Sequence, residues 1–151
     1  MAKDLWKTPR VVPSLVYEDV PSAIEWLSRA FGFRERADAR LTGNGFVLAW
    51  MEVGDGLITL ATSGGHGVQS PKSVGKTTQS VKVYVDDIDR HFERAKAAGA
   101  SIVSELADGF WGGRFYRAQD REGHQWEFSQ IDREWAAQEW KLPPGVRRGS
   151  S

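Results

Sequence analysis

The chain has 151 residues, 40% of them hydrophobic, and its 20 lysines and arginines balance 20 aspartates and glutamates. This length can bury a core in one domain or in two small joined halves. The balanced charge gives no field that would hold nucleic acid or an anionic membrane surface, so we expect neither as a partner. The chain has no cysteine, which excludes disulfides and thiolate metal sites. We find no apolar run long enough for a signal peptide or a membrane span, and we therefore expect a cytoplasmic protein.

The first half of the sequence predicts a strand, a helix and three more strands. Residues 11–17 form the first strand, and Asp19 then caps a helix whose apolar residues recur at helical spacing as far as Phe31. Gly32 ends this helix. The three further strands, separated by glycine-rich turns, are expected at residues 34–40, 46–53 and 57–62.

After a connector, the same order of elements begins again. Residues 63–79 are rich in Gly, Ser, Lys and Thr without periodicity, which predicts a mobile connector. A strand follows, and then a helix that is capped by Asp87 and ended by Gly99. The strands of this second set are expected at residues 80–85, 101–106, 114–119 and 124–130.

The repeat predicts an α+β protein built from two βαβββ modules, residues 11–62 and 80–130. An α+β protein with two helices and unrelated hairpins is the alternative, but the two helices fall at matching places in matching units. An N-terminal arm (residues 1–10) and a C-terminal tail (residues 131–151) flank the modules. Residues 131–141 of the tail could form a short helix whose tryptophans dock on the body or on a second subunit; a tail that only covers exposed core is the alternative.

Several segments of both modules follow one familiar pattern. In the first module they run through residues 13–33, from PSLVY to AFGF. In the second module they are VYVDDI (83–88), AAGA (97–100), WGGR (111–114) and DREGHQWEF (120–128). These segments resemble the vicinal-oxygen-chelate group, which contains glyoxalases, bleomycin-resistance proteins and extradiol dioxygenases. The resemblance covers residues 11–130 and implies cup-shaped half-barrels that are paired in a homodimer. It is specific for the fold, which hosts several chemistries.

The resemblance also implies metal ligands at four positions. They lie in the first strand of each module, seven residues before the capping aspartate, and in the last strand of each module. These positions correspond to Val12, Thr59, Ser80 and Glu127. A single carboxylate cannot hold a divalent metal that needs three or four protein donors, so we expect no metal and no other cofactor.

The three histidines give no reason to expect a metal site elsewhere. His66 lies in the connector, His124 follows the last turn and His91 lies early in a helix, so we expect all three to be exposed to solvent. They belong to different elements and have no spacing typical of metal ligands.

Alternation along the strands predicts which side chains line the concave face of each sheet. The valines at 81, 83 and 85 face the helices, which leaves Ser80, Lys82 and Tyr84 on the concave face. The same reasoning places Gln125 and Glu127 there from the last strand, Phe46, Leu48 and Trp50 from the third, and Val12, Ser14 and Val16 from the first. This mixture of aromatic, aliphatic and a few polar groups is typical of a small-molecule pocket. The candidate ligand-binding residues are Ser14, Trp50, Thr59, Ser80, Lys82, Tyr84, Trp111, Arg114, Gln125 and Glu127.

Two of these groups have plainer interpretations. Lys82 and Glu127 could simply form an ion pair in a wet groove, which would mean little for function. Trp111 and the two glycines after it could form a mobile rim of the pocket, or an ordinary turn.

The sequence leaves two main functional hypotheses. One is a metal-free binding protein, resembling bleomycin-resistance proteins, that sequesters a small, partly aromatic organic ligand. Because the net charge is zero, nothing favours a strongly cationic drug. The other is an enzyme, either with a non-standard metal site or metal-free with Glu127 as catalytic acid or base and Lys82 or Tyr84 stabilising negative charge. A regulatory role of the tail has no positive support.

Overall fold

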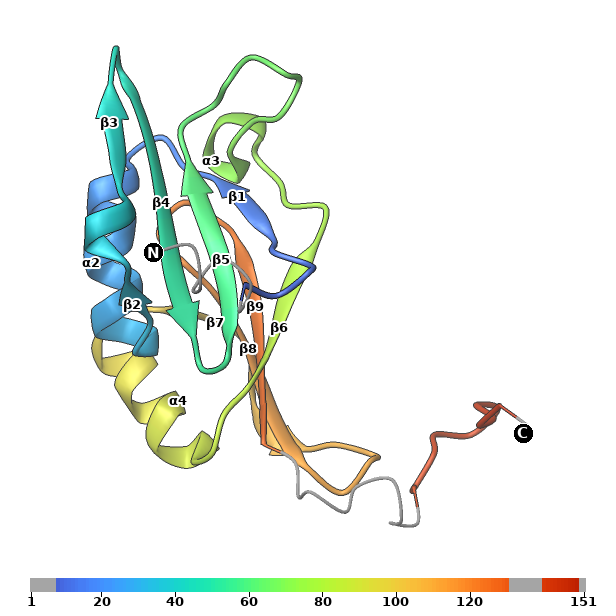
Figure 1. The fold of residues 1–151 in the computed structure, drawn as a ribbon. Helices are drawn as coiled ribbons and strands as arrows, with labels where there is room; N and C mark the ends of the chain where they lie inside the picture. Colours follow the sequence, from blue (N-terminus) through green and yellow to red (C-terminus); the bar gives the residue numbers. More distant parts are fainter. Residues whose placement is uncertain (1–7, 131–139, 150–151) are drawn as a thin grey trace.

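The computed structural model describes residues 8–130 and 140–149, and its first unit combines one helix with a mixed sheet (Figure 1). In chain order the unit contains β1 (Ser14–Val16), α2 (Val20–Phe31), β2 (Arg34–Glu35), the 3-10 helix η1 (Ala37–Ala39), β3 (Leu41–Gly43), β4 (Phe46–Val53) and β5 (Gly56–Ala61). The strand order is β1-β5-β4-β2, and β3 pairs with β4. The first and last strands are parallel, and the other pairs are antiparallel.

The second unit repeats this arrangement. It contains β6 (Ser80–Tyr84), α4 (Ile88–Ala97), β7 (Ser101–Asp108), β8 (Arg114–Gln119) and β9 (Gln125–Gln130). Its strand order is β6-β9-β8-β7, again with a parallel pair of first and last strands. The α+β class and the tandem βαβββ arrangement predicted from the sequence are therefore confirmed.

The structure corrects the sequence prediction at two places between strands. The strand expected at residues 34–40 stops after two residues, because η1 interrupts it. The chain then continues in the same direction as β3, which pairs with β4 further along and forms a hairpin with it. The expected connector contains the short helix α3 (Pro71–Val74). Ser70 begins this helix by accepting a hydrogen bond from the backbone N–H of Ser73, and Gly75 ends it in the left-handed conformation at φ 83°.

Both long helices begin as the sequence predicts. The carboxylate of Asp19 accepts hydrogen bonds from the backbone N–H of Ser22 at 3.1 Å and from its hydroxyl at 2.9 Å. Asp87 accepts from the backbone N–H of Arg90 at 3.1 Å. Each cap satisfies a backbone donor that the first turn of a helix leaves unpaired. Among the described residues, we find no helix with the length and apolar character needed to cross a membrane.

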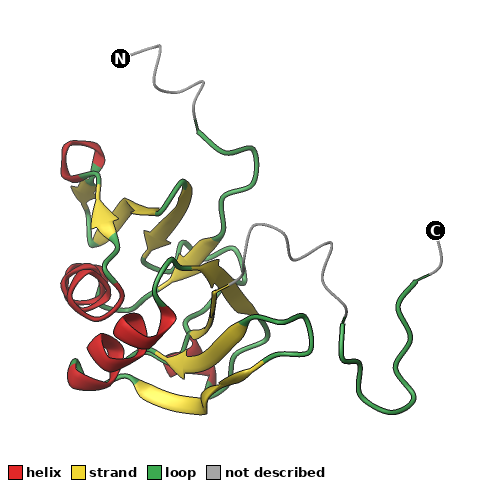
Figure 2. Cartoon of the chain, turned by 90° about the horizontal axis from the view of Figure 1, so that it is seen from below, coloured by secondary structure: helices red, strands yellow, loops and turns green. Residues whose placement is uncertain are grey.

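The two units share one hydrophobic core. Helices α2 and α4 lie next to each other, with strands of both sheets around them (Figure 2). At the end of α2, the ring of Phe31 lies 4.6 Å from that of Phe128 and 5.8 Å from that of Trp126, both on β9. The indole N–H of Trp26 donates a hydrogen bond to the carbonyl of Ala98 after α4 at 2.9 Å. The helix-facing sides of both sheets are thus buried together, and their opposite faces lie outside this core.

His91 is half-buried at the edge of this core rather than exposed to solvent, which corrects the sequence prediction. Its Nδ1 lies 2.6 Å from the hydroxyl of Tyr116, and its Nε2 lies 3.2 Å from the carbonyl oxygen of Phe31. Because a carbonyl can only accept, we assign the proton to Nε2 and let Nδ1 accept from Tyr116. Burial lowers the pKa of His91 from its ordinary value of 6.5 to about 4, and it raises the pKa of Tyr116.

The low pKa of His91 makes stability depend on acidity. A histidine that is neutral in the folded state contributes its full stability above its unfolded pKa of 6.5, and that contribution is lost as the pH falls toward about 4. The pKa difference corresponds to about 3 kcal/mol of unfolding free energy. We expect denaturant titrations to show this loss between about pH 7 and about pH 4.

The variant His91→Phe keeps an aromatic ring but cannot titrate, so its unfolding free energy should fall less over the same range. The control His66→Phe replaces an exposed histidine of the connector and should keep the wild-type slope. Equal pH slopes for wild type and His91→Phe would contradict this account.

His124 is buried, contrary to the sequence prediction. Its Nε2 lies 2.7 Å from the carbonyl oxygen of Val16, and its ring lies 4.5 Å from that of Tyr17. Both contacts reach from the start of β9 in the second unit to the end of β1 in the first. His124 therefore serves the packing of the two units.

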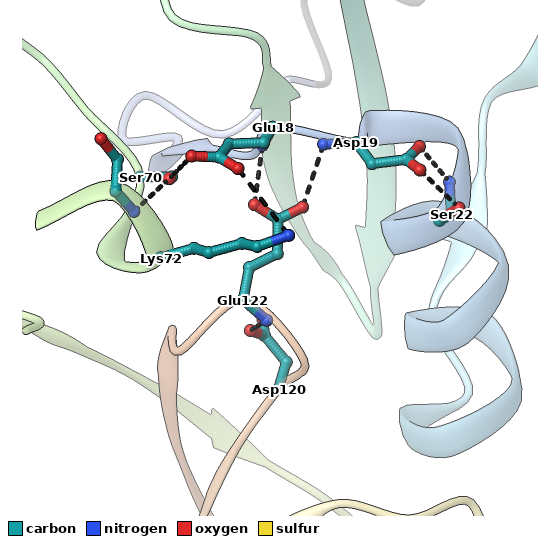
Figure 3. Close-up of polar contacts among 8 residues, drawn as sticks. Glu18, Asp19, Ser22, Ser70, Lys72, Asp120 and Glu122 are labelled. Carbon is teal, nitrogen blue, oxygen red and sulfur yellow. Dashed lines mark hydrogen bonds and ion pairs between the residues drawn. The ribbon is translucent and has the colours of Figure 1, made fainter. Parts of the chain in front are cut away.

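The turn between β8 and β9 is hydrogen-bonded to the segment that begins α2 (Figure 3). The carboxylate of Glu122 accepts hydrogen bonds from the backbone N–H groups of Glu18 at 2.7 Å and Asp19 at 3.0 Å. Beneath it, the hydroxyl of Tyr17 donates to Asp120 at 2.5 Å. These contacts join segments more than 100 residues apart and hold the second unit against the first.

Helix α3 of the connector is attached to the same corner. The hydroxyl of Ser70 donates to the carboxylate of Glu18 at 3.2 Å, and the ammonium of Lys72 lies 3.8 Å from that carboxylate (Figure 3). Part of the connector thus packs on the body of the protein.

Candidate functional site

Each sheet carries a row of three paired residues on the face opposite the helices. In the second unit, Lys82 of β6 pairs with Glu127 of β9, which pairs with Arg117 of β8. In the first unit, the three strands in the same positions bring together Ser14, Thr59 and Trp50. The two rows occupy equivalent places in the two modules. Five of the ten predicted ligand-binding residues lie in these rows.

The row in the second unit is an ion triad, formed by Lys82, Glu127 and Arg117. The ammonium of Lys82 lies 3.0 Å from Oε2 of Glu127, and Nη2 of Arg117 lies 2.7 Å from Oε1. The side chain of Glu127 is only 9% exposed, whereas those of Lys82 and Arg117 are 50% and 41% exposed. Both carboxylate oxygens are therefore occupied by cations, and the cations themselves face outward.

The sequence reasoning missed Arg117 although a signal was present. That signal is the alternation of apolar and other residues along residues 114–119. The apolar residues Tyr116 and Ala118 are buried on the helix side, which places Phe115 and Arg117 on the open face. The ion pair between Lys82 and Glu127 was foreseen as the plainer interpretation, and the structure contains it with a second cation added.

Aromatic rings flank the ion triad. The ammonium of Lys82 lies 5.8 Å from the ring centroid of Trp111, and the guanidinium carbon of Arg117 lies 5.0 Å from that of Phe115. The rings of Trp111 and Phe115 pack at 5.2 Å. The negative face of an aromatic ring attracts a cation, so each ring steadies one member of the triad.

Trp111 rests on a loop that requires glycine. A Cβ atom added to Gly109 would lie 2.5 Å from the indole, and one added to Gly113 would lie 2.3 Å from the carbonyl oxygen of Gln130. The glycines around Trp111 therefore let the indole pack closely against the loop backbone. Whether this rim moves stays a prediction.

A buried hydroxyl, that of Ser129, lies two residues after Glu127 on β9. Ser129 pairs with Tyr84 on one side and with Phe115 on the other. Its side chain is fully buried, and its Oγ has no hydrogen-bond partner among the residues that the structure describes. An unpaired buried hydroxyl costs about 1–3 kcal/mol, which makes this position unusual.

The remaining predicted site residues are dispersed. Ser80 and Gln125 pair beside the triad, and Tyr84 is 59% exposed at the far end of β6. Arg114 turns toward the helix side instead, where its guanidinium pairs with Asp89 at the start of α4. The predicted tail helix lies mainly outside the described residues. At its end, the ring of Trp140 lies 5.8 Å from that of Phe110.

Ser14 also lines a second hollow. A pocket of about 360 Å³ lies between β1, the connector and the buried His124. Its wall includes Lys76 and the polar residues 77–79 of the connector. The triad does not line this pocket.

The residues at the four expected ligand positions do not fit a divalent metal. Val12, Thr59 and Ser80 supply no imidazole or carboxylate, and both oxygens of Glu127 are directed at cations. Within residues 8–130 and 140–149, no three His, Cys, Asp or Glu side chains lie close enough to hold a metal ion.

A family model described as the Glyoxalase/Bleomycin resistance protein/Dioxygenase superfamily matches residues 10–128. The chain belongs to this superfamily. The resemblance found in the sequence is thus confirmed. A similar superfamily relative is the uncharacterized protein Rv0887c of Mycobacterium tuberculosis, which is 33% identical over 136 residues, or 83% of this chain and 76% of the relative. The uncharacterized protein Mb0911c of Mycobacterium bovis shows the same identity, over 86% of its length.

Solved protein structures also superpose on this chain. TioX from Micromonospora sp. ML1 is 38% identical and superposes with a TM-score of 0.65, over 82% of this chain and 97% of TioX. The fosfomycin resistance protein FosX from Listeria monocytogenes, solved with Mn(II) and sulfate, has a TM-score of 0.62 at 16% identity, over 84% of this chain and 93% of FosX. The second likeness shows a common fold.

Proposed function

We propose that this superfamily member binds and sequesters a small, partly aromatic organic molecule without using a metal, and that it does so in the cytoplasm. The observation that carries the proposal is the ion triad. Lys82 and Arg117 occupy both oxygens of Glu127, the one residue among the four expected ligand positions that could bind a metal. Around the triad, Trp111 and Phe115 offer flat apolar surfaces, which suit a ring by stacking.

The alternative enzyme hypothesis gains less support from the same contacts. A general acid or base must exchange a proton with the substrate and therefore needs a free oxygen within reach of it. Glu127 is buried and held by two cations on opposite oxygens. It serves better as an anchor for the two cations than as a proton carrier.

A second copy of the chain is the proposed partner. The open faces of the sheets carry large apolar side chains that remain exposed: Leu41 (56%), Phe46 (38%) and Tyr84 (59%). A homodimer that sets the row of the first unit in one copy against the ion triad of the other would cover these residues and bring Trp50 next to the triad. Sedimentation velocity should then give the mass of two chains, and a monomer at all concentrations would contradict this part.

The binding function is tested by a tryptophan-fluorescence screen of a small-molecule library, run with and without a chelator. Some flat organic compounds should quench the emission saturably, and the chelator should leave their affinities unchanged. Trp50→Leu and Trp111→Leu should each weaken these affinities about tenfold, the loss expected for one stacking contact. The control Val146→Ala changes an exposed apolar residue outside the sheets. Saturable binding that requires an added metal would overturn the proposal.

A further inference from the structure

We propose that the ligand of the second unit's open face carries a negatively charged group, such as a carboxylate, which binds to Lys82 and Arg117 while its ring stacks on Trp111 or Phe115. This inference rests on the proposed binding function and adds the charge of the ligand. It assigns the ion triad a role in recognition beyond its role in packing.

The donors of the triad are not exhausted by Glu127. An ammonium has three N–H donors and a guanidinium has five. Each cation is directed by one side of its head group to Glu127, at 3.0 Å and 2.7 Å, and each side chain remains about half exposed, at 50% and 41%. The remaining donors can reach an anion above the sheet. The rings of Trp111 and Phe115 hold both head groups in place.

The acceptor of the triad is buried, which disfavours a cationic ligand. Both oxygens of Glu127 already accept from a cation, and its side chain is only 9% exposed. An incoming ammonium would have little access to this buried carboxylate and would first meet the two exposed positive charges of Lys82 and Arg117. The charged side chains of this row sum to one positive charge.

The buried hydroxyl of Ser129 is a second, independent indication. Its Oγ is fully buried and has no hydrogen-bond partner within residues 8–130 and 140–149, and it lies next to Phe115 in the neighbouring strand. The indole of Trp111 packs on Phe115 at this corner of the sheet. A ligand oxygen that reaches this hydroxyl beside the two rings would accept the hydrogen bond that Ser129 makes with none of the described residues. An unsatisfied buried donor is thereby converted into part of the anion site.

Isothermal titration calorimetry of the full-length protein with three matched probes tests the inference. The probes are naphthoate, naphthamide and naphthylmethylammonium, which share one ring and carry negative, zero and positive charge. We expect naphthoate to bind about tenfold more tightly than naphthamide, as a charge-assisted hydrogen bond provides, and naphthylmethylammonium to bind most weakly. Lys82→Gln and Arg117→Gln should each remove most of the preference, so that naphthoate and naphthamide bind with similar affinity to the same variant.

Matched controls come from two cations that lie on aromatic rings elsewhere in the protein. Lys96 lies 5.3 Å from the ring of Phe92, and Arg121 lies 5.9 Å from that of Trp26. Lys96→Gln and Arg121→Gln should keep the naphthoate preference. Since Arg117→Gln leaves a buried carboxylate with one partner and could impair folding, Ser129→Ala serves as a second test. It should fold normally and bind naphthoate several-fold more weakly.

The outcomes separate the charge of the ligand from the binding function itself. Equal affinities for the three probes would overturn the charge assignment and leave the proposed binding function standing. A preference for naphthylmethylammonium would also overturn it. If no probe gives saturable heat while the fluorescence screen finds other ligands, the anion site is wrong and the binding function is right. A failure of both experiments would overturn both proposals.

Discussion

Replacing Asp120 with alanine is expected to reduce the free energy of unfolding by about 3–5 kcal/mol. This buried carboxylate accepts from the hydroxyl of Tyr17 at 2.5 Å and from the indole N–H of Trp126 at 3.1 Å. It also accepts from the backbone N–H groups of Glu122 and His124. Burial and the negative charge of Asp120 raise the pKa of Tyr17, so the phenol stays a donor. Without Asp120 these buried donors lose their acceptor.

Denaturant titration of Asp120→Ala beside Asp38→Ala measures this effect. Asp38 is exposed in η1, so its loss should change stability by less than about 0.5 kcal/mol. Tyr17→Phe, which removes one donor but leaves the carboxylate, should cost about 1 kcal/mol. If Asp120→Ala were as mild as Asp38→Ala, the polar network between the units would not be a source of stability.

Replacing Phe31 with alanine should cost about 3–5 kcal/mol as well. Phe31 is 4% exposed at the end of α2, and its ring contacts Phe128, Trp126 and Phe33. Because the contacts with Phe128 and Trp126 cross from the first unit to the second, the loss should appear in both units together. We expect one cooperative transition, shifted to lower denaturant, by far-ultraviolet circular dichroism and by tryptophan fluorescence.

The control for this prediction is Phe46→Ala. Phe46 is 38% exposed on the open face of β4, so it contributes less to the core of one chain. Two separate transitions in Phe31→Ala, or a loss confined to one probe, would show that the units fold independently and would contradict the shared core.

The elements set by local chemistry could be predicted from the sequence. The N-cap residues Asp19 and Asp87 indicate where both helices begin. The matching order of elements around each cap predicts the βαβββ repeat. Alternation also placed Lys82 and Glu127 together on one face of the second sheet, as their pairing shows. Such features depend on residues a few positions apart, which a sequence displays directly.

Contacts between the units could not be predicted in this way. The sequence predicts both His91 and His124 in solvent. This prediction is wrong because His91 contacts Phe31, 60 residues away, and His124 contacts Val16, 108 residues away. The short helix α3 was missed because four residues are too few to show a periodicity. Its position depends on contacts with Glu18 in the distant first unit.

The set of charged side chains at the site likewise depends on the pairing of three strands, β6, β8 and β9. Arg117 takes its place beside Glu127 through the register of β8 and β9. The sequence pattern identifies Glu127 as a possible ligand but does not indicate which residues lie beside it. The structure adds that this carboxylate is held by two cations, and this changes the chemistry expected of it.

The most direct test of the account is metal analysis of protein purified without a chelator, combined with thermal unfolding in the presence of nickel, zinc, manganese or iron(II). If Lys82 and Arg117 hold Glu127 as the structure shows, the purified protein should contain far less than one metal ion per chain, and micromolar metal should not raise its melting temperature. Stoichiometric metal that is lost in Glu127→Gln, or a clear rise in melting temperature, would contradict the account and give the lead to a metal-dependent enzyme.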